Sequence, residues 1–551
     1  QNTRTLSVGI EYYKPTGRMP SISGASATAL VTVLAMTAGG FPGPVPAGCA
    51  RILAVETVGG RSHWNFMSGI IRALVDNGHT VTAFTPFLDG DRANYTEVDI
   101  STGFPVGLDL DVVGLLDHFR NPLWTYGAYV EMGRSQCDAI YSHAEMKRLL
   151  RDSAGFDAVI IESFWSECMS YAAARLGLPL IYVTPLPVVA FMERTITGHV
   201  SNPAVVSNLM TGHAVPATFG QRLANAALHV YGSAVQRYKE FQLRYTGPPK
   251  EYDLVDPVPP SLVFVNRHFI SDAPSPVPRN VVDVGGIHLK AAKVLPKDVL
   301  EFIEQSPHGV IYFTLGSTVK MSTIPESVKK GLIKALARVP QRVLLKYEDK
   351  MDDKPENMMT KRWLPQLHPN VKLFISHGGI SGLYETVDAG VPVLGFPLIG
   401  DQARNIDNLV NAGMAISMDL LSITEDSFLK NVLELLNNKK YSENAKNAMK
   451  IFKDRPMSPE SLVVYWTEYV LRHHGAPHLK SCALNLKWYQ YYLLDVMAFT
   501  LVCISFVVLV IYNIFKFAAC VVYTNISNHL RDVKVKLILS WCRIPRSRIS
   551  I

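Results

Sequence analysis

One stretch in the C-terminal half combines residue types that could bind an anion at the start of a helix. Residues 376–390 read SHGGISGLYETVDAG and carry no acidic residue before Glu385. The apolar run VKLF precedes them, so we expect a strand that ends near the histidine and a helix that begins at about Ile380. Gly378 and Gly379 would let a ligand approach the backbone closely, and exposed amides together with the helix dipole favour an anion such as phosphate.

Polar residues beyond the glycines extend this predicted site. Ser381 and Glu385 are four residues apart, so both should face the same side of the helix, where a carboxylate could accept hydrogen bonds from sugar hydroxyls. Asp401 and Gln402 follow the next predicted strand after a short loop and should line the same crevice. In the alternative interpretation, the glycines only permit tight packing and Glu385 is solvated.

A histidine in the N-terminal half lies where a proton acceptor could act. His63 belongs to the stretch VGGRSHWNF, which follows the first predicted strand and precedes a helix. Imidazole with a pKa near its usual ~6.5 can take a proton from a hydroxyl group at neutral pH. A lone histidine in a loop is more often a cap or a surface residue, so the residues alone leave this alternative open. No Cys/His spacing in the sequence indicates zinc, and no acid pair stands out at a strand end.

Apolar runs alternate with amphipathic helices from residue 50 onward, which is typical of a parallel α/β sheet. The first predicted strand is ARILAVET at 50–57, and the helix that returns from it is MSGIIRALVDNG at 67–78. Further strands are predicted, in chain order, at HTVTAFTP, FDAVIIES, LPLIYVTP, SLVFVN, VVDVGGI, GVIYFTLGS, RVLLKYE, VKLFISHGG and VPVLGFP.

A proline-rich linker at 248–260 divides these strands into two series, the second of which is expected to start at SLVFVN, 261–266. We therefore predict an N-terminal domain at 50–250 and a C-terminal domain at 251–480. Binding residues collect at the carboxyl ends of the strands in such sheets, so a ligand held in the cleft between the two halves is expected. The helix-rich stretch 186–250 would supply its substrate-facing insertions.

The net charge of +7 comes almost entirely from one end of the chain. From Lys516 onward there are seven Lys/Arg and one acid, Asp532, which leaves about +1 for all that precedes them. The folded part is thus nearly neutral, and no basic surface argues for a nucleic-acid partner.

The run YYLLDVMAFTLVCISFVVLVIYNIF at 491–515 is long enough to cross a bilayer as a helix. With the neighbouring aromatic residues it predicts a transmembrane helix at 489–515, followed by a cytosolic basic tail at 516–551. A buried core helix is the alternative. The residues before the span should then lie in a lumen or outside the cell.

This orientation requires a secretory signal, and the N-terminal extension at 1–49 offers one between Met19 and Gly48. The sequon at Asn94 could be glycosylated in a lumen, whereas a second sequon at Asn525 would lie on the cytosolic side. The seven cysteines do not suggest a disulfide framework.

The segment FISHGGISGLYETVDAGVPVLGFPLIGDQ at 374–402 resembles the signature of the animal membrane-bound UDP-glycosyltransferases, specifically the arthropod type. The resemblance extends over approximately 50–515 and includes VIYFTLGS, KRWLPQ and the terminal apolar span. It implies two Rossmann-like domains that face each other across a cleft (the GT-B arrangement), with the UDP-sugar bound by the C-terminal half.

The resemblance also assigns roles around the donor. Trp363 would stack on uracil and Gln366 would contact the nucleoside. Glu385 would hold the ribose hydroxyls, while His377 and Ser317 would lie against the diphosphate.

The resemblance likewise assigns residues beside the phosphate and the sugar of the donor. Gly379 and Ser381 would lie beside the phosphate, where many relatives have asparagine in place of the serine. Asp401 and Gln402 would hydrogen-bond the sugar.

The family's general base is the histidine that corresponds to His63, and its partner is an aspartate at the end of the strand FDAVIIES. Glu162 occupies that position here and is one methylene longer. The implied reaction is direct transfer of a hexose, with glucose favoured, to a hydroxyl group of a small lipophilic acceptor. It proceeds with inversion and without a metal or other cofactor, and it serves detoxification in the endoplasmic-reticulum membrane.

The loop after Gln366 is shorter than in relatives, which leaves open a non-catalytic membrane partner of active UDP-glycosyltransferases as an alternative. A homo- or hetero-oligomer is compatible with either hypothesis. A nicotinamide dehydrogenase is excluded because no GxGxxG opens a helix with an acid about 20 residues further on.

Overall fold

The computed structural model describes residues 49–104, 111–152, 155–163, 165, 167–187, 192–290, 295–317, 319–362 and 370–541. The predicted signal segment, Trp363, Gln366 and the shortened loop after Gln366 lie outside the described residues. Within them, the strands form two parallel sheets with helices between, which is the α/β arrangement expected from the sequence.

The first sheet has seven described strands in the order β3-β2-β1-β4-β5-β6-β7. Neighbouring strands are parallel throughout, as their registers show. Strands β4 and β5 are buried along their whole length, so their near-continuous apolar sequence is that of strands covered on both faces. The strands are β1 (Arg51–Val55), β2 (Thr80–Thr85), β3 (Tyr95–Asp99), β4 (Ala158–Glu162), β5 (Leu180–Thr184), β6 (Leu262–Val265) and β7 (Val281–Asp283).

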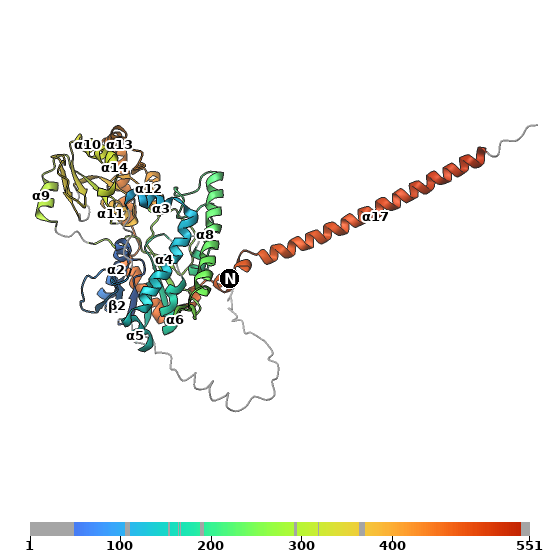
Figure 1. Ribbon diagram of the computed structural model, residues 1–551, viewed down its shortest axis with the longest axis horizontal. Helices are drawn as coiled ribbons and strands as arrows, with labels where there is room; N and C mark the ends of the chain where they lie inside the picture. Colours follow the sequence, from blue (N-terminus) through green and yellow to red (C-terminus); the bar gives the residue numbers. More distant parts are fainter. Residues whose placement is uncertain are drawn as a thin grey trace, which may run out of the picture. The chain divides into compact units, whose positions relative to one another are not determined.

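Helices of the first half return the chain between these strands. Helix α8 begins with a capping box in which Thr218 and Gln221 satisfy each other's backbone amides, and it packs along α4 (Figure 1). Helix α4 begins with Pro122 after the cap residue Asn121. These helices are α2 (Arg61–Asp76), α3 (Val112–Arg120), α4 (Pro122–Ser142), α5 (Ala144–Asp152), α6 (Tyr171–Leu176), α7 (Glu193–Thr197) and α8 (Phe219–Tyr245).

The second sheet has six described strands in the order β10-β9-β8-β11-β12-β13, again parallel. Its strands are β8 (Val310–Thr314), β9 (Arg342–Lys346), β10 (Met358–Lys361), β11 (Val371–Ser376), β12 (Val393–Gly395) and β13 (Ala415–Ser417). Its helices are α9 (Lys297–Glu304), α10 (Glu326–Ala337), α11 (Ile380–Ala389), α12 (Gln402–Asn411), α13 (Glu425–Asn437) and α14 (Lys439–Lys453). Separate apolar clusters fill the space on the two faces of this sheet.

Two strands that we expected in the second sheet belong to the first sheet. The segments SLVFVN and VVDVGGI were predicted to open the second half, but β6 and β7 extend the first sheet beyond β5. The prediction is wrong because a buried apolar strand has the same sequence pattern in either sheet. The proline-rich linker therefore lies within the first half and does not separate the two sheets.

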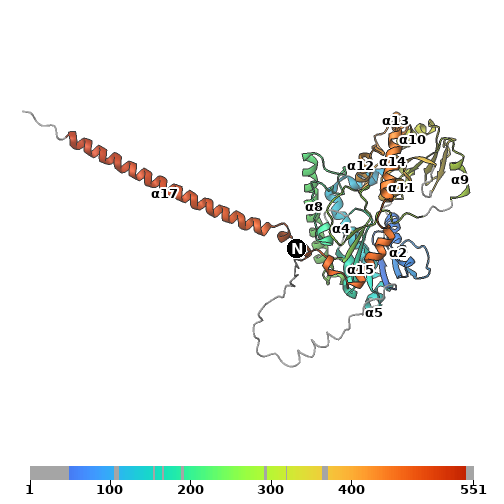
Figure 2. The same cartoon turned by 180° about the vertical axis from the view of Figure 1, so that it is seen from behind.

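A late helix also joins the first half. Helix α15 (Pro459–Arg472) follows α14 but packs against α2 and β6, as Figure 2 shows for α15 and α2. The chain thus passes from the first half to the second after β7 and returns to the first after α14.

The apolar C-terminal run forms one long helix, α17 (Leu494–Trp541), of 48 residues. It follows a short helix, α16 (Trp488–Tyr491), and the two are separated at Leu493, which has a positive φ of 54°. The helix starts at residue 494 rather than at the expected 489 and continues well beyond residue 515. By length and composition it could cross a membrane, and it is the one described helix for which this holds.

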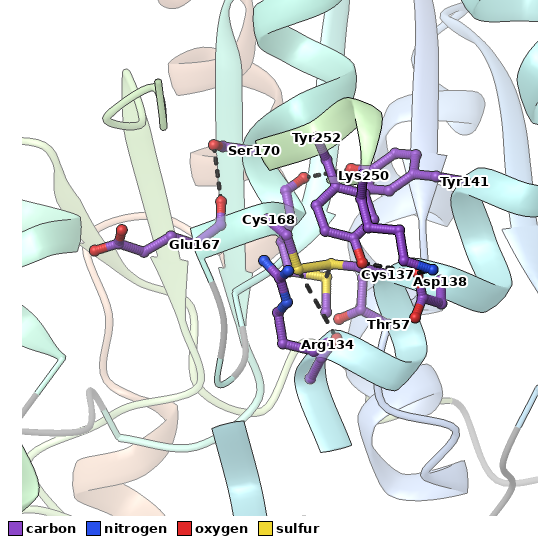
Figure 3. The surroundings of a disulfide bond; sticks show 12 residues. Thr57, Arg134, Cys137, Asp138, Tyr141, Glu167, Cys168, Ser170, Lys250 and Tyr252 are labelled. Carbon is purple, nitrogen blue, oxygen red and sulfur yellow. Dashed lines mark hydrogen bonds and ion pairs between the residues drawn. A yellow bond between two sulfur atoms is a disulfide. The ribbon is translucent and has the colours of Figure 1, made fainter. Parts of the chain in front are cut away.

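A disulfide joins Cys137 on α4 to Cys168 in the short 3-10 helix Glu167–Ser170 (Figure 3). Beside it, Arg134 forms a buried ion pair with Asp253, and Tyr252 donates a hydrogen bond to Asp138. One disulfide among the described residues is not a disulfide framework, but this pairing was not predicted.

Candidate active site

The predicted base and its predicted partner are in contact. His63 lies in the first turn of α2, and Glu162 is the last residue of β4. The two come together because β1 and β4 are adjacent parallel strands, so the loop after β1 passes the carboxyl end of β4. Nδ1 of His63 contacts Oε1 of Glu162, so Nε2 is the ring nitrogen that does not face this glutamate. The longer glutamate side chain therefore still reaches the imidazole.

Glu56, which the sequence analysis overlooked, is a third member of this group. It follows β1 directly and is completely buried. The hydroxyl of the next residue, Thr57, donates a hydrogen bond of 3.0 Å to the carbonyl oxygen of Glu162 and so ties the ends of β1 and β4 together. The signal available in the sequence was an acid at the end of an apolar strand, the same signal that marked Glu162.

Burial controls the charge of all three groups. Desolvation lowers the pKa of His63, although the charges of Glu56 and Asp401 oppose this shift. Desolvation also raises the pKa of Glu162 to about 8, and it raises the pKa of Glu56 well above its ordinary value, to which the nearby Glu162 charge adds. Near neutral pH the imidazole is thus uncharged and able to accept a proton.

The HGG motif lies at the end of β11, and α11 begins directly after it, as predicted. Helix α11 has Gly379 as its cap residue, no side-chain cap and no acid in its first turn. The ring of His377 fills the space beside two glycines, because a Cβ on Gly316 would lie 2.5 Å from its Cε1 and one on Gly379 would lie 2.6 Å from its Nε2. Packing within the protein therefore accounts for the glycine at 379, as the alternative interpretation held.

A buried imidazole and a lysine lie near this helix start. Burial and, to a smaller extent, the charge of Lys346 together lower the pKa of His377 to about 4. Lys346, at the end of β9, donates a hydrogen bond of 2.5 Å to the carbonyl oxygen of Gly316. This lysine was not predicted; its ammonium group also pairs with Glu348 at 3.3 Å.

Two polar side chains of α11, Ser381 and Glu385, are at least partly buried. Oγ of Ser381 is buried and has no hydrogen-bond partner among the described residues. Glu385 is half-buried, and burial raises its pKa to about 7.

The start of α12 connects the two groups of site residues. Asp401 precedes α12 and is buried, and its Oδ2 accepts a hydrogen bond of 2.6 Å from Asn405, which also donates to the carbonyl oxygen of Gly378. The charge of Asp401 acts to raise the pKa of His63, and His63 acts to lower the pKa of Asp401, which burial raises. Oε1 of Gln402 is occupied by the backbone amides of residues 398 and 399.

Trp363 and Gln366 cannot be placed, because they lie outside the described residues. Among the described residues, no group of three or more His, Cys, Asp or Glu side chains is arranged to hold a metal ion. The described candidates lie at the carboxyl ends of β1, β4, β8, β11 and β12, the edge where parallel sheets bind ligands.

Comparison with known proteins decides the family. A family model described as UDP-glucoronosyl and UDP-glucosyl transferase matches residues 113–528. The chain belongs to this family. UDP-glucosyltransferase 2 of Dactylopius coccus is 36% identical over 496 residues, which cover 86% of this chain and 92% of that protein. Human UDP-glucuronosyltransferase 2B15 is 29% identical over 499 residues, which cover 84% of this chain and 92% of that protein.

Among solved structures, a spinosyn rhamnosyltransferase complexed with thymidine diphosphate aligns with a TM-score of 0.51 at 15% identity, covering 76% of this chain and 100% of that one. This likeness confirms the fold expected from the sequence, the GT-B arrangement. The family match and the relatives make the chain a UDP-glycosyltransferase.

Proposed function

We propose that this UDP-glycosyltransferase transfers a hexose, glucose in particular, from its UDP-sugar to a hydroxyl group of small lipophilic acceptors and thereby conjugates and detoxifies them. The observation that carries the proposal is the contact of a neutral His63 with Glu162 at the edge that also faces Asp401. Glucose is favoured because the relative from Dactylopius coccus is named a UDP-glucosyltransferase.

In the proposed donor site, the amides at the start of α11 hold the diphosphate beside His377, Gly379, Ser381 and Ser317. The buried Oγ of Ser381 supplies a hydroxyl that has no other described partner. Glu385 accepts hydrogen bonds from the ribose, and Asp401 and the free amide of Gln402 bind the sugar. Trp363 and Gln366 bind the uridine.

The proposed chemistry is a single displacement at the anomeric carbon. Nε2 of His63 takes the proton of the acceptor hydroxyl, the oxygen forms a bond to the anomeric carbon, and the bond from that carbon to the diphosphate oxygen breaks. UDP departs with the electron pair, and the configuration inverts. Glu162 stabilises the imidazolium, and the amides of α11 hold the charge of the departing UDP. We therefore expect turnover to continue in the presence of a metal chelator.

Replacement of His63 by alanine tests this function. The purified full-length protein in detergent is incubated with labelled UDP-glucose, or with UDP-glucuronate, and a panel of phenols. We expect His63→Ala to lose at least about a hundredfold in kcat, the contribution typical of a general base, while UDP binding by calorimetry is retained. His473→Ala, an exposed histidine after α15, is the matched control and should behave as the wild type.

Two results would contradict the proposal. Near wild-type turnover by His63→Ala would exclude the mechanism. Retained UDP binding without transfer by the wild type would favour the non-catalytic partner of active UDP-glycosyltransferases.

We also propose that the protein resides in the endoplasmic-reticulum membrane, with the part of α17 up to residue 515 as its span, its two sheets in the lumen and its basic tail from residue 516 in the cytosol. The disulfide supports this orientation because such bonds persist in oxidising compartments. Asn94 is exposed in a turn, where a glycan could be attached. Loss of an endoglycosidase-sensitive gel shift in Asn94→Gln would support a lumenal location; a wild type without any such shift would contradict it.

A further inference from the structure

A second buried glutamate lies beside the acid partner of His63. Val55 of β1 pairs in register with Ile161 of β4, so the next residues, Glu56 and Glu162, are neighbours across two parallel strands. Side chains at paired positions face the same side of a sheet, which brings the two carboxyl groups together. Both are completely buried, with 0% of their surface exposed.

Two ionised carboxylates in this position would repel each other strongly in a buried site. Apart from each other, the groups that act on the two carboxyl groups are His63 from α2 and the backbone amides of Thr57 and Val58 in the loop after β1, and no lysine or arginine is among them. Asp401, which faces His63 from the segment before α12, is itself an acid. One carboxyl group of the pair must therefore keep its proton.

We propose that Glu56 carries this proton and donates it in a hydrogen bond to Glu162, which keeps Glu162 ionised and His63 in the Nδ1–H tautomer. The inference rests on the proposed function and deepens it. Glu56 is thus a positioning residue, because it acts through Glu162 and His63 and does not touch the substrate.

The unsatisfied atoms of the cluster support this assignment. Oε1 of Glu162 is occupied by His63, whereas Oε2 and both oxygens of Glu56 have no hydrogen-bond partner among the described residues. A protonated Glu56 satisfies its own hydroxyl and Oε2 of Glu162 in one hydrogen bond. If Glu162 carried the proton toward His63 instead, Nδ1 would be the acceptor, Nε2 would hold the hydrogen, and the base would be lost.

The direction of the pH dependence follows from the same arrangement. Burial raises the pKa of Glu162 to about 8, and the proposed hydrogen bond from Glu56 would act against that rise. The ionised, active form of Glu162 is therefore lost as the pH falls below about 8. Without the donor, the pKa of Glu162 should rise further, and the acid limb of kcat/KM should move to higher pH.

Two substitutions of Glu56 test the proposal in the full-length protein. Glu56→Gln keeps a neutral donor, so kcat should stay within about tenfold of the wild type and the acid limb should stay in place. Glu56→Met has a similar shape but no donor, so kcat should fall at least about tenfold below that of Glu56→Gln, with the acid limb displaced upward by about one pH unit. Glu193→Gln, a buried glutamate that accepts hydrogen bonds from Ser201, is the matched control.

The overturning results are equally definite. If kcat fell more than tenfold in Glu56→Gln, the carboxyl group itself would be needed. If Glu56→Gln and Glu56→Met had equal kcat, a hydrogen-bond donor at position 56 would not be needed. Should Glu56→Met fail to fold, as judged by thermal unfolding and UDP binding, the activity and acid limb of Glu56→Gln decide alone. Inactivity of the wild type, or full activity of His63→Ala, would instead refute the proposed function.

Discussion

At the residue scale, the position of the His377 ring depends on the absence of side chains at Gly316 and Gly379. Gly316 has a φ of +78°, a conformation that other residues rarely adopt, whereas Gly379 has an ordinary φ of −61°. Alanine at 379 would therefore be free of backbone strain and would act only through its Cβ, 2.6 Å from Nε2 of His377. This makes Gly379 a clean probe of the ring's position.

We expect Gly379→Ala to displace the imidazole and to weaken UDP binding by about tenfold, equivalent to about 1.4 kcal/mol, with little change in the free energy of unfolding. Calorimetric titration with UDP measures this change. Gly212→Ala is the control, because a Cβ at 212 would meet no atom within 4 Å. Unchanged UDP affinity in Gly379→Ala would mean that His377 does not contribute to the donor site.

Where a motif carried a residue, its place in the fold could be predicted, while its role stays a prediction. His63, Glu162 and His377 follow or end apolar strands as expected, because an apolar run followed by a polar residue marks such an end. Glu56 satisfied the same criterion but was missed, since its importance depends on β1 lying next to β4. Strand order is set by tertiary packing, which no local pattern records.

At the scale of single elements, α4 contacts the loop that leads to His63 and the segment that follows Glu162. Gln136 donates a hydrogen bond of 3.2 Å to the carbonyl oxygen of Val58, in the loop that leads to His63. The next residue, Cys137, is bonded to Cys168, in the segment that follows Glu162 (Figure 3). Two consecutive residues of one helix thus restrain both loops.

Removal of the disulfide should therefore affect stability and catalysis together. The bridge closes a sequence separation of 31 residues, for which the loss of chain entropy predicts a stabilisation of about 3–4 kcal/mol. We expect Cys137→Ser to lower the free energy of unfolding by about this amount and also to lower kcat, as measured by denaturant titration and turnover of the purified protein.

Cys482→Ser, which removes an exposed free cysteine, is the matched control and should change neither quantity. A Cys137→Ser variant of wild-type stability would show that the bridge does not form in solution.

Elements of strong local pattern were predictable, whereas their assignment to a sheet was not. The apolar sequence of β6 and β7 revealed strands, but their place beside β5 depends on a connection of more than seventy residues that includes α8. The disulfide was hidden for the same reason: α4 and the segment after β4 meet only once the first sheet is complete.

At the scale of the whole molecule, buried polar contacts join the two halves. Arg404 on α12 forms a buried ion pair with Asp272, between β6 and β7, and donates a hydrogen bond to the carbonyl oxygen of Ser207. Tyr384 on α11 contacts the hydroxyl of Ser271 at 2.6 Å. These groups position Asp401, three residues before Arg404, relative to His63.

We expect Arg404→Met to lower the free energy of unfolding by about 3–5 kcal/mol, because it leaves the Asp272 carboxylate buried and unpaired. The double variant with Asp272→Asn should recover part of this loss. Denaturant unfolding monitored by tryptophan fluorescence measures both. Arg338→Met, which breaks an exposed ion pair with Glu425, should cost no more than about 1 kcal/mol.

An equal effect of Arg404→Met and Arg338→Met would show that the buried pair does not hold the halves together. A transition that splits into two steps in Arg404→Met would show that the halves then unfold separately.

The return of α15 to the first half has a mechanical consequence. The chain crosses between the halves once after β7 and again after α14, so two segments connect the halves instead of one. A pair of pivots permits swinging about the line that joins them and resists twisting across it. We therefore expect any opening that admits an acceptor or releases UDP to follow a single arc, along which Asp401 would keep one path relative to His63.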